Sequence, residues 1–249
     1  MRLLTACLAA SLAFLAVPAS AAEFSDSQKT EIESIVRSYL LANPEVLEEA
    51  FTALQERRRE AESVAQRDAV GENKEALFNS PRQAVLGNPD GDVTVVEFFD
   101  YNCGYCRQAA QDLDKLISEN PNLKVVLKEF PVLGPPSVEA SQVGIAVNEV
   151  APERYGEFHD ALLASESRVD GKTALALVDK LGIDRAAVEK AMDSDTVQAT
   201  IEEVYALANT LSLTGTPSYV VGDAVFVGAV GYDTLQGQVN KLTCGEATC

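Results

Sequence analysis

The sequence predicts a mixed α/β domain preceded by an amphipathic helical arm, and three observations indicate this fold. An apolar run rich in β-branched and aromatic residues, residues 93–99, is followed by helical periodicity over residues 107–117. A second apolar run, residues 123–130, indicates another strand. A long helical section then leads to a pair of short apolar runs and a last helix. This order of elements predicts one mixed domain with a long helical section inside it.

The first 21 residues have the pattern of a secretory signal peptide. Arg2 supplies the positive start, residues 3–17 the apolar stretch, and Ala19-Ser20-Ala21 the small residues of a cleavage site. The apolar stretch is too short for an ordinary membrane span. We therefore expect an exported, periplasmic protein in an oxidising compartment where disulfides persist.

Residues 22–80 predict the helical arm and a connector. Apolar side chains recur at helical spacing in two segments, which Asn43-Pro44 separates. Residues 55–74 are mostly Glu, Arg, Ala and Gln and predict an exposed helical connector. The apolar residues of the two segments are Ile32, Ile35, Val36, Tyr39, Leu40, Val46, Leu47, Ala50, Phe51 and Leu54.

Two short amphipathic helices cannot bury their apolar stripes alone. The arm must therefore dock either on the domain that follows or on another subunit. We favour self-association into a homo-oligomer, with an arm folded back on its own domain as the alternative.

Residues 81–243 predict the mixed domain, with its helical section at about residues 137–211. Short apolar runs at residues 219–221 and 224–227 flank the turn signal Gly222-Asp223 and predict a hairpin. A last helix is expected over residues 232–242 and a polar tail over residues 244–249. Three breaks divide the helical section: Ala151-Pro152, Asp170-Gly171 and Gly182.

The chain is strongly acidic, with a formal net charge of −18. Such a surface argues against nucleic acid or an anionic membrane as a partner and favours solubility. Hydrophobic residues make up 47% of the chain, which is enough to form a real core.

The most informative motif is Cys103-Gly104-Tyr105-Cys106, which follows the first apolar run and opens a helix. Unpaired backbone amides and the positive end of the helix dipole favour a thiolate at a helix N-terminus. A lowered pKa makes Cys103 a nucleophile and a good leaving group. Cys106, one turn further, is placed to close a disulfide with it. The sequence thus predicts a redox-active pair.

Zinc binding and a merely structural disulfide are the alternative interpretations of this motif. A four-ligand zinc site needs a second CxxC or a His pair, whereas the chain has one histidine, His159, without that spacing. His159 lies in the helical section and is interpreted as a packing residue. We expect no metal and no cofactor.

The order of elements around CxxC, with a helical insertion before a Thr-Pro strand, resembles the thioredoxin fold in its DsbA-like form over about residues 88–242. Residues 214–218, Thr-Gly-Thr-Pro-Ser, are similar to the cis-proline loop of that family. The resemblance implies that Thr216 and Pro217 lie against the CxxC motif and pair with an extended client.

Two charged residues within the apolar runs carry the same resemblance. Glu97, six residues before Cys103, resembles the buried acid of these enzymes; its pKa should be raised, and it could exchange protons with Cys106. Lys128 interrupts the second strand, and the resemblance implies that it is the partner of Glu97. A strand-edge ion pair without a catalytic part is the alternative.

The dipeptide between the cysteines tunes the redox potential in this superfamily. Strong oxidases of the family that this chain resembles have Pro-His at these two positions. Gly104-Tyr105 and Thr216 instead resemble the corresponding residues of disulfide isomerases. The arm resembles the oligomerisation segment of ScsC-like proteins. The resemblance implies isomerisation or reduction of wrong disulfides in exported proteins, with Tyr105 available for client contact and a membrane thiol reductase as electron donor. A net disulfide oxidase with a quinone-linked partner is the first alternative, and a Cu(I)-binding or holdase protein is the second.

Cys244 and Cys249 follow the last helix in the polar tail. Four intervening residues permit a small structural disulfide, which we favour over a second redox relay because the pair lacks a strand-to-helix setting.

Overall fold

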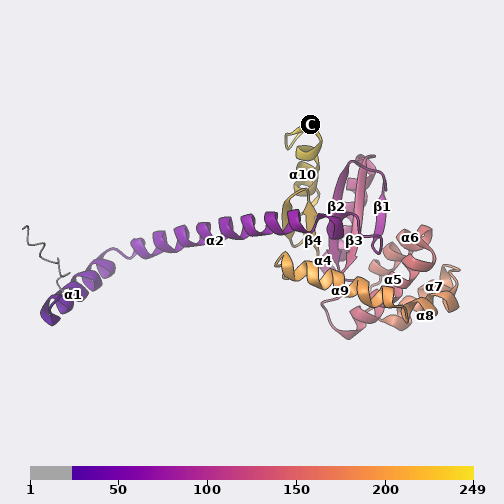
Figure 1. The fold of residues 1–249 in the computed structure, drawn as a ribbon, viewed down its shortest axis with the longest axis horizontal. Helices are drawn as coiled ribbons and strands as arrows, with labels where there is room; N and C mark the ends of the chain where they lie inside the picture. Colours follow the sequence, from indigo (N-terminus) through magenta and orange to yellow (C-terminus); the bar gives the residue numbers. More distant parts are fainter. Residues whose placement is uncertain (1–23) are drawn as a thin grey trace, which may run out of the picture. The chain divides into compact units, whose positions relative to one another are not determined.

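The computed structural model describes residues 24–249, and these fall into two units, residues 24–57 and 58–249, with the boundary inside helix α2. Figure 1 shows both units and labels most of their helices and strands. The signal peptide expected at residues 1–21 lies outside the described residues. Across residues 24–249, no helix combines the length and the apolar composition needed to cross a membrane.

The first unit consists of α1 (Asp26–Ala42) and the first part of α2 (Glu45–Glu72). Ser25 caps α1: its hydroxyl accepts from the Gln28 N–H at 3.3 Å, and the Gln28 side chain accepts from the Ser25 N–H at 2.9 Å. No residue in the range 24–57 is buried. The apolar stripe is therefore uncovered within this unit, and its most exposed members are Ile35, Val36, Tyr39 and Phe51.

The second unit is built on a five-stranded sheet with the strand order β1-β3-β2-β4-β5. Strands β2 and β3 are parallel, and every other neighbouring pair is antiparallel. The strands are β1 (Ala84–Gly87), β2 (Val93–Phe99), β3 (Leu123–Glu129), β4 (Ser218–Val221) and β5 (Ala224–Val227). The two predicted long strands and the hairpin are confirmed, and β1 is an additional edge strand that the sequence analysis missed.

Side chains of β2 alternate between the two faces of the sheet, as the strand pleat requires. Val95 and Phe99 join the core that contains residues of α4 (Gly104–Glu119) and α10 (Tyr232–Cys244). Val96 and Phe98 join a second core that contains residues of α3 (Lys74–Phe78) and α9 (Asp195–Thr210). The sheet is thus covered on both faces.

The end of α2 belongs to the second core. Ala69 and Val70 are buried there, and the Gln66 side chain donates to the Leu211 carbonyl at 3.0 Å. The expectation of an exposed connector over residues 55–74 is therefore wrong for the last turns of α2. Only Ala69 and Val70 are buried in an otherwise polar segment, so helical periodicity gave no sign of this contact.

The helical section lies between β3 and β4, as predicted. Its breaks are also confirmed, because Ala151 separates α5 from α6 and Gly182 lies between α7 and α8. Asp170, Asp184 and Ser194 cap three of the helices by accepting a backbone N–H from the third residue of the helix. The helices are α5 (Pro135–Val150), α6 (Pro152–Leu163), α7 (Gly171–Lys180), α8 (Arg185–Met192) and α9.

Candidate active site

Cys103 is the N-cap residue of α4, directly after the turn that leaves β2. Its N–H donates to the Asp100 carbonyl at 2.9 Å, which closes the turn. Cys103 and Cys106 are both free thiols, and they lie one helical turn apart. The predicted placement of the CxxC motif at a helix start is therefore what the structure has.

The Cys103 thiol is unusually acidic. A hydrogen bond from the Cys106 thiol lowers the pKa of Cys103 to about 5, the backbone N–H groups of Cys106 and Tyr105 add to this effect, and partial burial opposes it. The sulfur of this N-cap residue lies close to the first free N–H groups of α4 without closing a regular capping hydrogen bond. Cys103 is therefore a thiolate at neutral pH.

Cys106 has the opposite character. It is 1% exposed, and its pKa is raised far above that of an ordinary thiol, first by its hydrogen bond to Cys103 and then by burial and the charge of Glu97. Cys106 thus stays protonated until a nearby base accepts its proton.

The cis-proline loop faces Cys103. The bond between Thr216 and Pro217 is cis, and the Cys103 sulfur lies 3.2 Å from the Thr216 carbonyl oxygen. The Ser218 hydroxyl donates to the Gly215 carbonyl at 2.7 Å, and the Gly228 N–H donates to the Pro217 carbonyl at 2.8 Å. These two bonds fix the loop that the sequence resemblance places against the CxxC motif.

Glu97 lies on β2, on the face covered by α4, and is 3% exposed. Burial is the main reason that the pKa of Glu97 is raised to about 7, and the negative charge on Cys103 raises it further. The Tyr219 hydroxyl donates to Glu97 Oε1 at 3.2 Å, and this hydrogen bond acts in the opposite direction by lowering the pKa. A carboxyl group that titrates near neutral pH next to a buried thiol can accept a proton. Tyr219, one of its partners, escaped the sequence analysis because nothing in the hairpin pattern marks it.

The predicted pairing of Lys128 with Glu97 is wrong. The strand register places Lys128 beside Phe98 and Glu97 beside Leu127, so the two charged side chains leave opposite faces of the sheet. Lys128 Nζ instead donates to the Ala76 carbonyl at 2.8 Å and lies 3.6 Å from Glu203 Oε1.

Burial lowers the pKa of Lys128 to about 8. Its partner Glu203 also binds Arg82 and Gln83, which places the lysine in a polar cluster between α3 and α9, away from the thiols. A partner that is 75 residues away along the chain leaves no local signal in the sequence.

Apolar side chains are exposed near the Cys103 turn. Tyr105 is 66% exposed, and Val132 and Leu133 in the loop after β3 are also exposed. The Leu133 N–H donates to Asp100 Oδ2 at 2.9 Å, which holds this loop beside the turn. The three side chains leave an exposed apolar surface near Cys103.

His159 is buried and packs edge-on against Phe99 and stacked on Tyr155, and burial lowers its pKa to about 3. It is a neutral core residue. Among residues 24–249, no group of three or more His, Cys, Asp or Glu side chains has an arrangement that could hold a metal ion.

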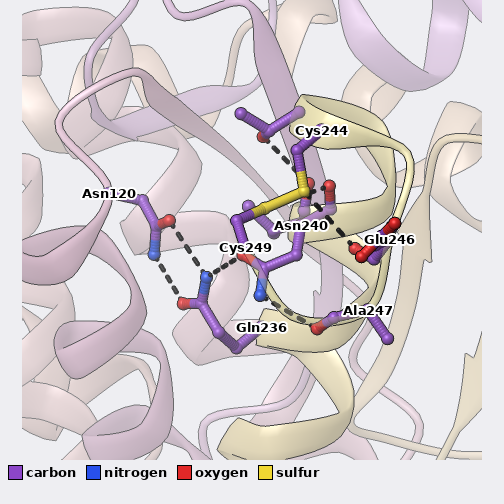
Figure 2. Close-up of a disulfide and its surroundings, with 9 residues drawn as sticks. Asn120, Gln236, Asn240, Cys244, Glu246, Ala247 and Cys249 are labelled. Atoms are coloured by element: carbon purple, nitrogen blue, oxygen red, sulfur yellow. Dashed lines mark hydrogen bonds between the residues drawn. A yellow bond between two sulfur atoms is a disulfide. The ribbon is translucent and has the colours of Figure 1, made fainter.

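A disulfide joins Cys244, the last residue of α10, to Cys249. Figure 2 shows the tail folded back on α10, where Asn240 donates to the Ala247 carbonyl at 2.9 Å and Gln236 bonds Asn120. Asn120 is the C-cap of α4, so this cluster lies at the end of α4 opposite to Cys103.

Two family comparisons match this chain. The DSBA-like thioredoxin domain matches residues 94–240, more than half of the chain, and the N-terminal domain of the copper resistance protein ScsC matches residues 28–61.

Solved structures give the same result. A thioredoxin-like oxidoreductase from Silicibacter pomeroyi is 39% identical, covers 69% of this chain and 98% of its own, and has a TM-score of 0.66. ScsC from Proteus mirabilis in a transitional conformation is 30% identical, covers 91% of this chain and 100% of its own, and has a TM-score of 0.66.

Curated relatives are more distant. The thiol:disulfide interchange protein DsbA from Bordetella pertussis is 26% identical over 135 residues, which are 53% of this chain and 64% of that protein. A Na(+)/H(+) antiporter of Salinispora arenicola is 26% identical over 166 residues, and the matching part spans only 25% of its length.

Proposed function

The chain belongs to the DSBA-like thioredoxin-domain family of thiol:disulfide oxidoreductases, and from this premise we propose that it isomerises or reduces wrong disulfides in exported proteins. The observation that carries the proposal is the Cys103 thiolate, with a lowered pKa, 3.2 Å from the carbonyl of the cis-proline loop. A client strand that pairs with Thr216 would bring its disulfide to that sulfur.

The first step is attack of the Cys103 thiolate on one sulfur of the client disulfide. The client S–S bond breaks, a Cys103–client disulfide forms, and the second client sulfur leaves as a thiolate. A different client thiolate can then attack the client sulfur of this mixed disulfide, which releases Cys103 as a thiolate and leaves a rearranged client. This route changes no oxidation state overall.

The second route is reduction. Glu97 accepts the Cys106 proton, and the Cys106 thiolate attacks the Cys103 sulfur, so that a Cys103–Cys106 disulfide forms and the client leaves with two added electrons. To act again, the enzyme needs two electrons from a thiol reductase, and a membrane protein of that class is the partner that we propose.

Refolding of scrambled ribonuclease, which carries wrong disulfides, tests the proposal. The reduced enzyme should restore ribonuclease activity, and Cys103→Ser should abolish the effect. Cys106→Ser should retain part of the isomerisation, because the first route does not use Cys106. Activity confined to the oxidised enzyme acting on fully reduced ribonuclease would refute isomerisation.

That result would support the alternative, a net disulfide oxidase re-oxidised by a quinone-linked membrane partner. The low pKa of Cys103 favours this alternative, because a stable thiolate stabilises the reduced enzyme and so makes the disulfide form more oxidising. Equilibration with glutathione separates the two: a potential near that of strong oxidases supports the oxidase.

Copper binding has weaker support. Residues 28–61, which match the ScsC N-terminal domain, contain no Cys, His or Met and therefore none of the soft ligands that Cu(I) prefers. Cu(I) would have to use Cys103 and Cys106, and a copper titration with Cys103→Ser as the control measures this.

We also propose that the arm forms a homo-oligomer and that the protein works in the periplasm. The exposed stripe of residues 24–57 supports association, because an uncovered apolar helix face is stable only when something buries it. Assembly would place several active sites around one client.

Sedimentation of the mature chain tests the arm. Ile35→Glu with Phe51→Glu should convert an oligomer to a monomer, since both side chains belong to the exposed stripe. Ser34→Glu, an exposed polar position of α1, is the control and should leave the oligomer intact. A wild-type monomer would refute the idea.

A further inference from the structure

The residue before the nucleophile, Asn102, makes three hydrogen bonds through its side chain. Its Oδ1 accepts from the Val169 N–H at 2.7 Å, and its Nδ2 donates to the Val169 carbonyl at 2.9 Å and to the Ser137 hydroxyl at 3.0 Å. The carboxamide therefore pairs with the peptide group of Val169 as a neighbouring strand would, donor to acceptor and acceptor to donor.

Both partners lie in the helical section. Val169 is in the segment between α6 and α7, Ser137 is in the first turn of α5, and the side chains of both are fully buried. Asn102 thus connects the Cys103 turn to two segments that lie 35 and 67 residues away along the chain.

Asp100 holds the same turn from the inside. Its Oδ1 accepts from the Asn102 N–H at 2.8 Å, and its Oδ2 accepts from the Leu133 N–H at 2.9 Å. Together with the bond from the Cys103 N–H to the Asp100 carbonyl, these contacts leave the turn between β2 and α4 few alternative conformations.

We propose that Asn102 is a positioning residue for thiol–disulfide exchange: its carboxamide anchors the turn to the helical section and thereby fixes the direction in which Cys103 presents its sulfur. The proposal rests on exchange chemistry at Cys103. Only the adjacent sulfur meets the client; Asn102 acts through the backbone that joins them.

The physical link is the geometry of the helix start. Cys103 has an extended backbone, with φ −81° and ψ 115°, and this conformation holds its sulfur near the backbone N–H groups of Tyr105 and Cys106 at the start of α4. A turn that rotates freely would hold these N–H donors at varying distances from the sulfur and so stabilise the thiolate less.

Only asparagine meets the requirements of this position. Aspartate lacks the two N–H donors and adds a negative charge beside the thiolate, glutamine adds one methylene, and alanine leaves the buried peptide group of Val169 without either bond.

The chain supplies a matched control at the other end of the same helix. Asn120, the C-cap of α4, donates from Nδ2 to the Leu116 carbonyl at 2.7 Å and to Gln236 Oε1 at 2.7 Å. Asn120→Ala therefore removes comparable bonds from α4 without touching the Cys103 turn.

The test measures the pH dependence of Cys103 alkylation in the reduced full-length mature protein, together with thermal unfolding. Asn102→Ala should raise the Cys103 pKa by about one unit, and its equilibrium with glutathione should shift toward the disulfide form. Asn120→Ala should lower the unfolding temperature by a similar amount and leave the Cys103 pKa unchanged.

An Asn102→Ala pKa equal to the wild-type value overturns the proposal, as does an equal rise in Asn120→Ala. If Asn102→Ala does not fold, Asn102→Ser, whose shorter side chain keeps one polar atom but not the pair of bonds to Val169, replaces it with the same expected rise and the same contrary outcome. An ordinary thiol pKa in the wild-type protein would instead refute the primed nucleophile of the proposed function, so the two failures are distinguishable.

Discussion

The two active-site sulfur atoms lie one helical turn apart, yet they have opposite acidities. Cys103 lies at the free N–H groups of α4, whereas Cys106 lies further inside, beside Glu97, where a second negative charge is unfavourable. Under the proposed function, this asymmetry makes Cys103 the group that attacks first. In the proposed reductive route, it also makes proton transfer from Cys106 the step that governs release.

Glu97→Gln should slow that release. In the wild-type protein, release of a client from Cys103 should accelerate as the pH rises through the pKa of Glu97, which is about 7 beside the Cys103 thiolate and lower in the mixed disulfide, where Cys103 carries no charge. A neutral amide accepts no proton, so the acceleration should disappear and release should slow by roughly 10²-fold. Rapid quenching of a mixed disulfide between Cys103 and a small peptide measures the rate.

The control is Asp114→Asn, which removes another nearby carboxyl group and should keep the acceleration. An unchanged pH profile in Glu97→Gln would contradict the assigned role.

Glu129→Gln should change how stability depends on pH. Burial raises the pKa of Glu129 from 4.5 to about 8, while the Tyr155 hydroxyl donates to it at 2.9 Å. Between these two values only the folded state holds the proton, so rising pH favours unfolding. The variant should lose less stability between pH 5 and pH 8, by on the order of 2 kcal/mol.

Urea unfolding at both pH values measures this difference, with exposed Glu166→Gln as the control. Equal pH dependence in wild type and Glu129→Gln would refute the assignment.

The residues of the site that could be predicted are those marked by local sequence. Two cysteines after an apolar strand, an acid inside that strand and a Thr-Pro before the hairpin are visible in short windows. The hydrogen bonds of Asn102 and the partner of Lys128 are not, because Val169 and Glu203 lie 67 and 75 residues away and nothing near them marks the contact.

At the scale of elements, α5 crosses the end of β3 closely, and a glycine permits the approach. A Cβ on Gly144 would lie 2.4 Å from Glu129 Oε1 and 2.9 Å from the Tyr101 hydroxyl. The Tyr101 hydroxyl hydrogen-bonds Glu129 and the Tyr155 hydroxyl, and Tyr101 itself lies in the turn that leads to Cys103. The close spacing between α5 and β3 therefore depends on Gly144 having no side chain.

Gly144→Ala should destabilise the protein by about 1–3 kcal/mol, because the added methyl group forces α5 away from the sheet. Gly71→Ala, in α2, should instead stabilise it by about 0.5–1 kcal/mol, since nothing lies within 4 Å of the new Cβ and alanine is the better helix former. Chemical denaturation of the two variants and the wild-type protein measures both changes in the free energy of unfolding. A stable Gly144→Ala would show that α5 shifts without cost.

The order of elements could be predicted because each long strand and helix has its own periodicity. The missed strand β1 has only four residues and lies at the sheet edge, where alternation is too short to distinguish from a loop. The docked end of α2 was missed for a related reason, because two small apolar residues in a charged helix do not form a stripe.

At the scale of the whole molecule, the two ends of α4 have separate tasks. The N-terminal end carries the nucleophile, and the C-terminal end meets α10 through Asn120 and Gln236, next to the stapled tail. We therefore expect the tail disulfide to affect the packing of α10 and not the chemistry at Cys103.

Replacing both Cys244 and Cys249 by serine should lower stability by about 2 kcal/mol, the chain-entropy value for so short a loop. Thiol–disulfide exchange at Cys103 should be unchanged, because the pair lies at the far end of α4. Thermal unfolding and a refolding assay on the same preparation measure the two effects. A loss of exchange activity without a loss of stability would indicate a redox relay through the tail.

The order of the two acidities near the active site determines how the protein behaves in acid surroundings. At about pH 6 the Cys103 thiol is largely ionised, because its pKa is about 5, while Glu97 is largely protonated, because its pKa is about 7. Under the proposed function, capture by Cys103 then continues while release through Cys106 slows, so covalent adducts with clients would accumulate. Acidification would thus convert the enzyme to a form that holds clients as mixed disulfides, and neutralisation would release them.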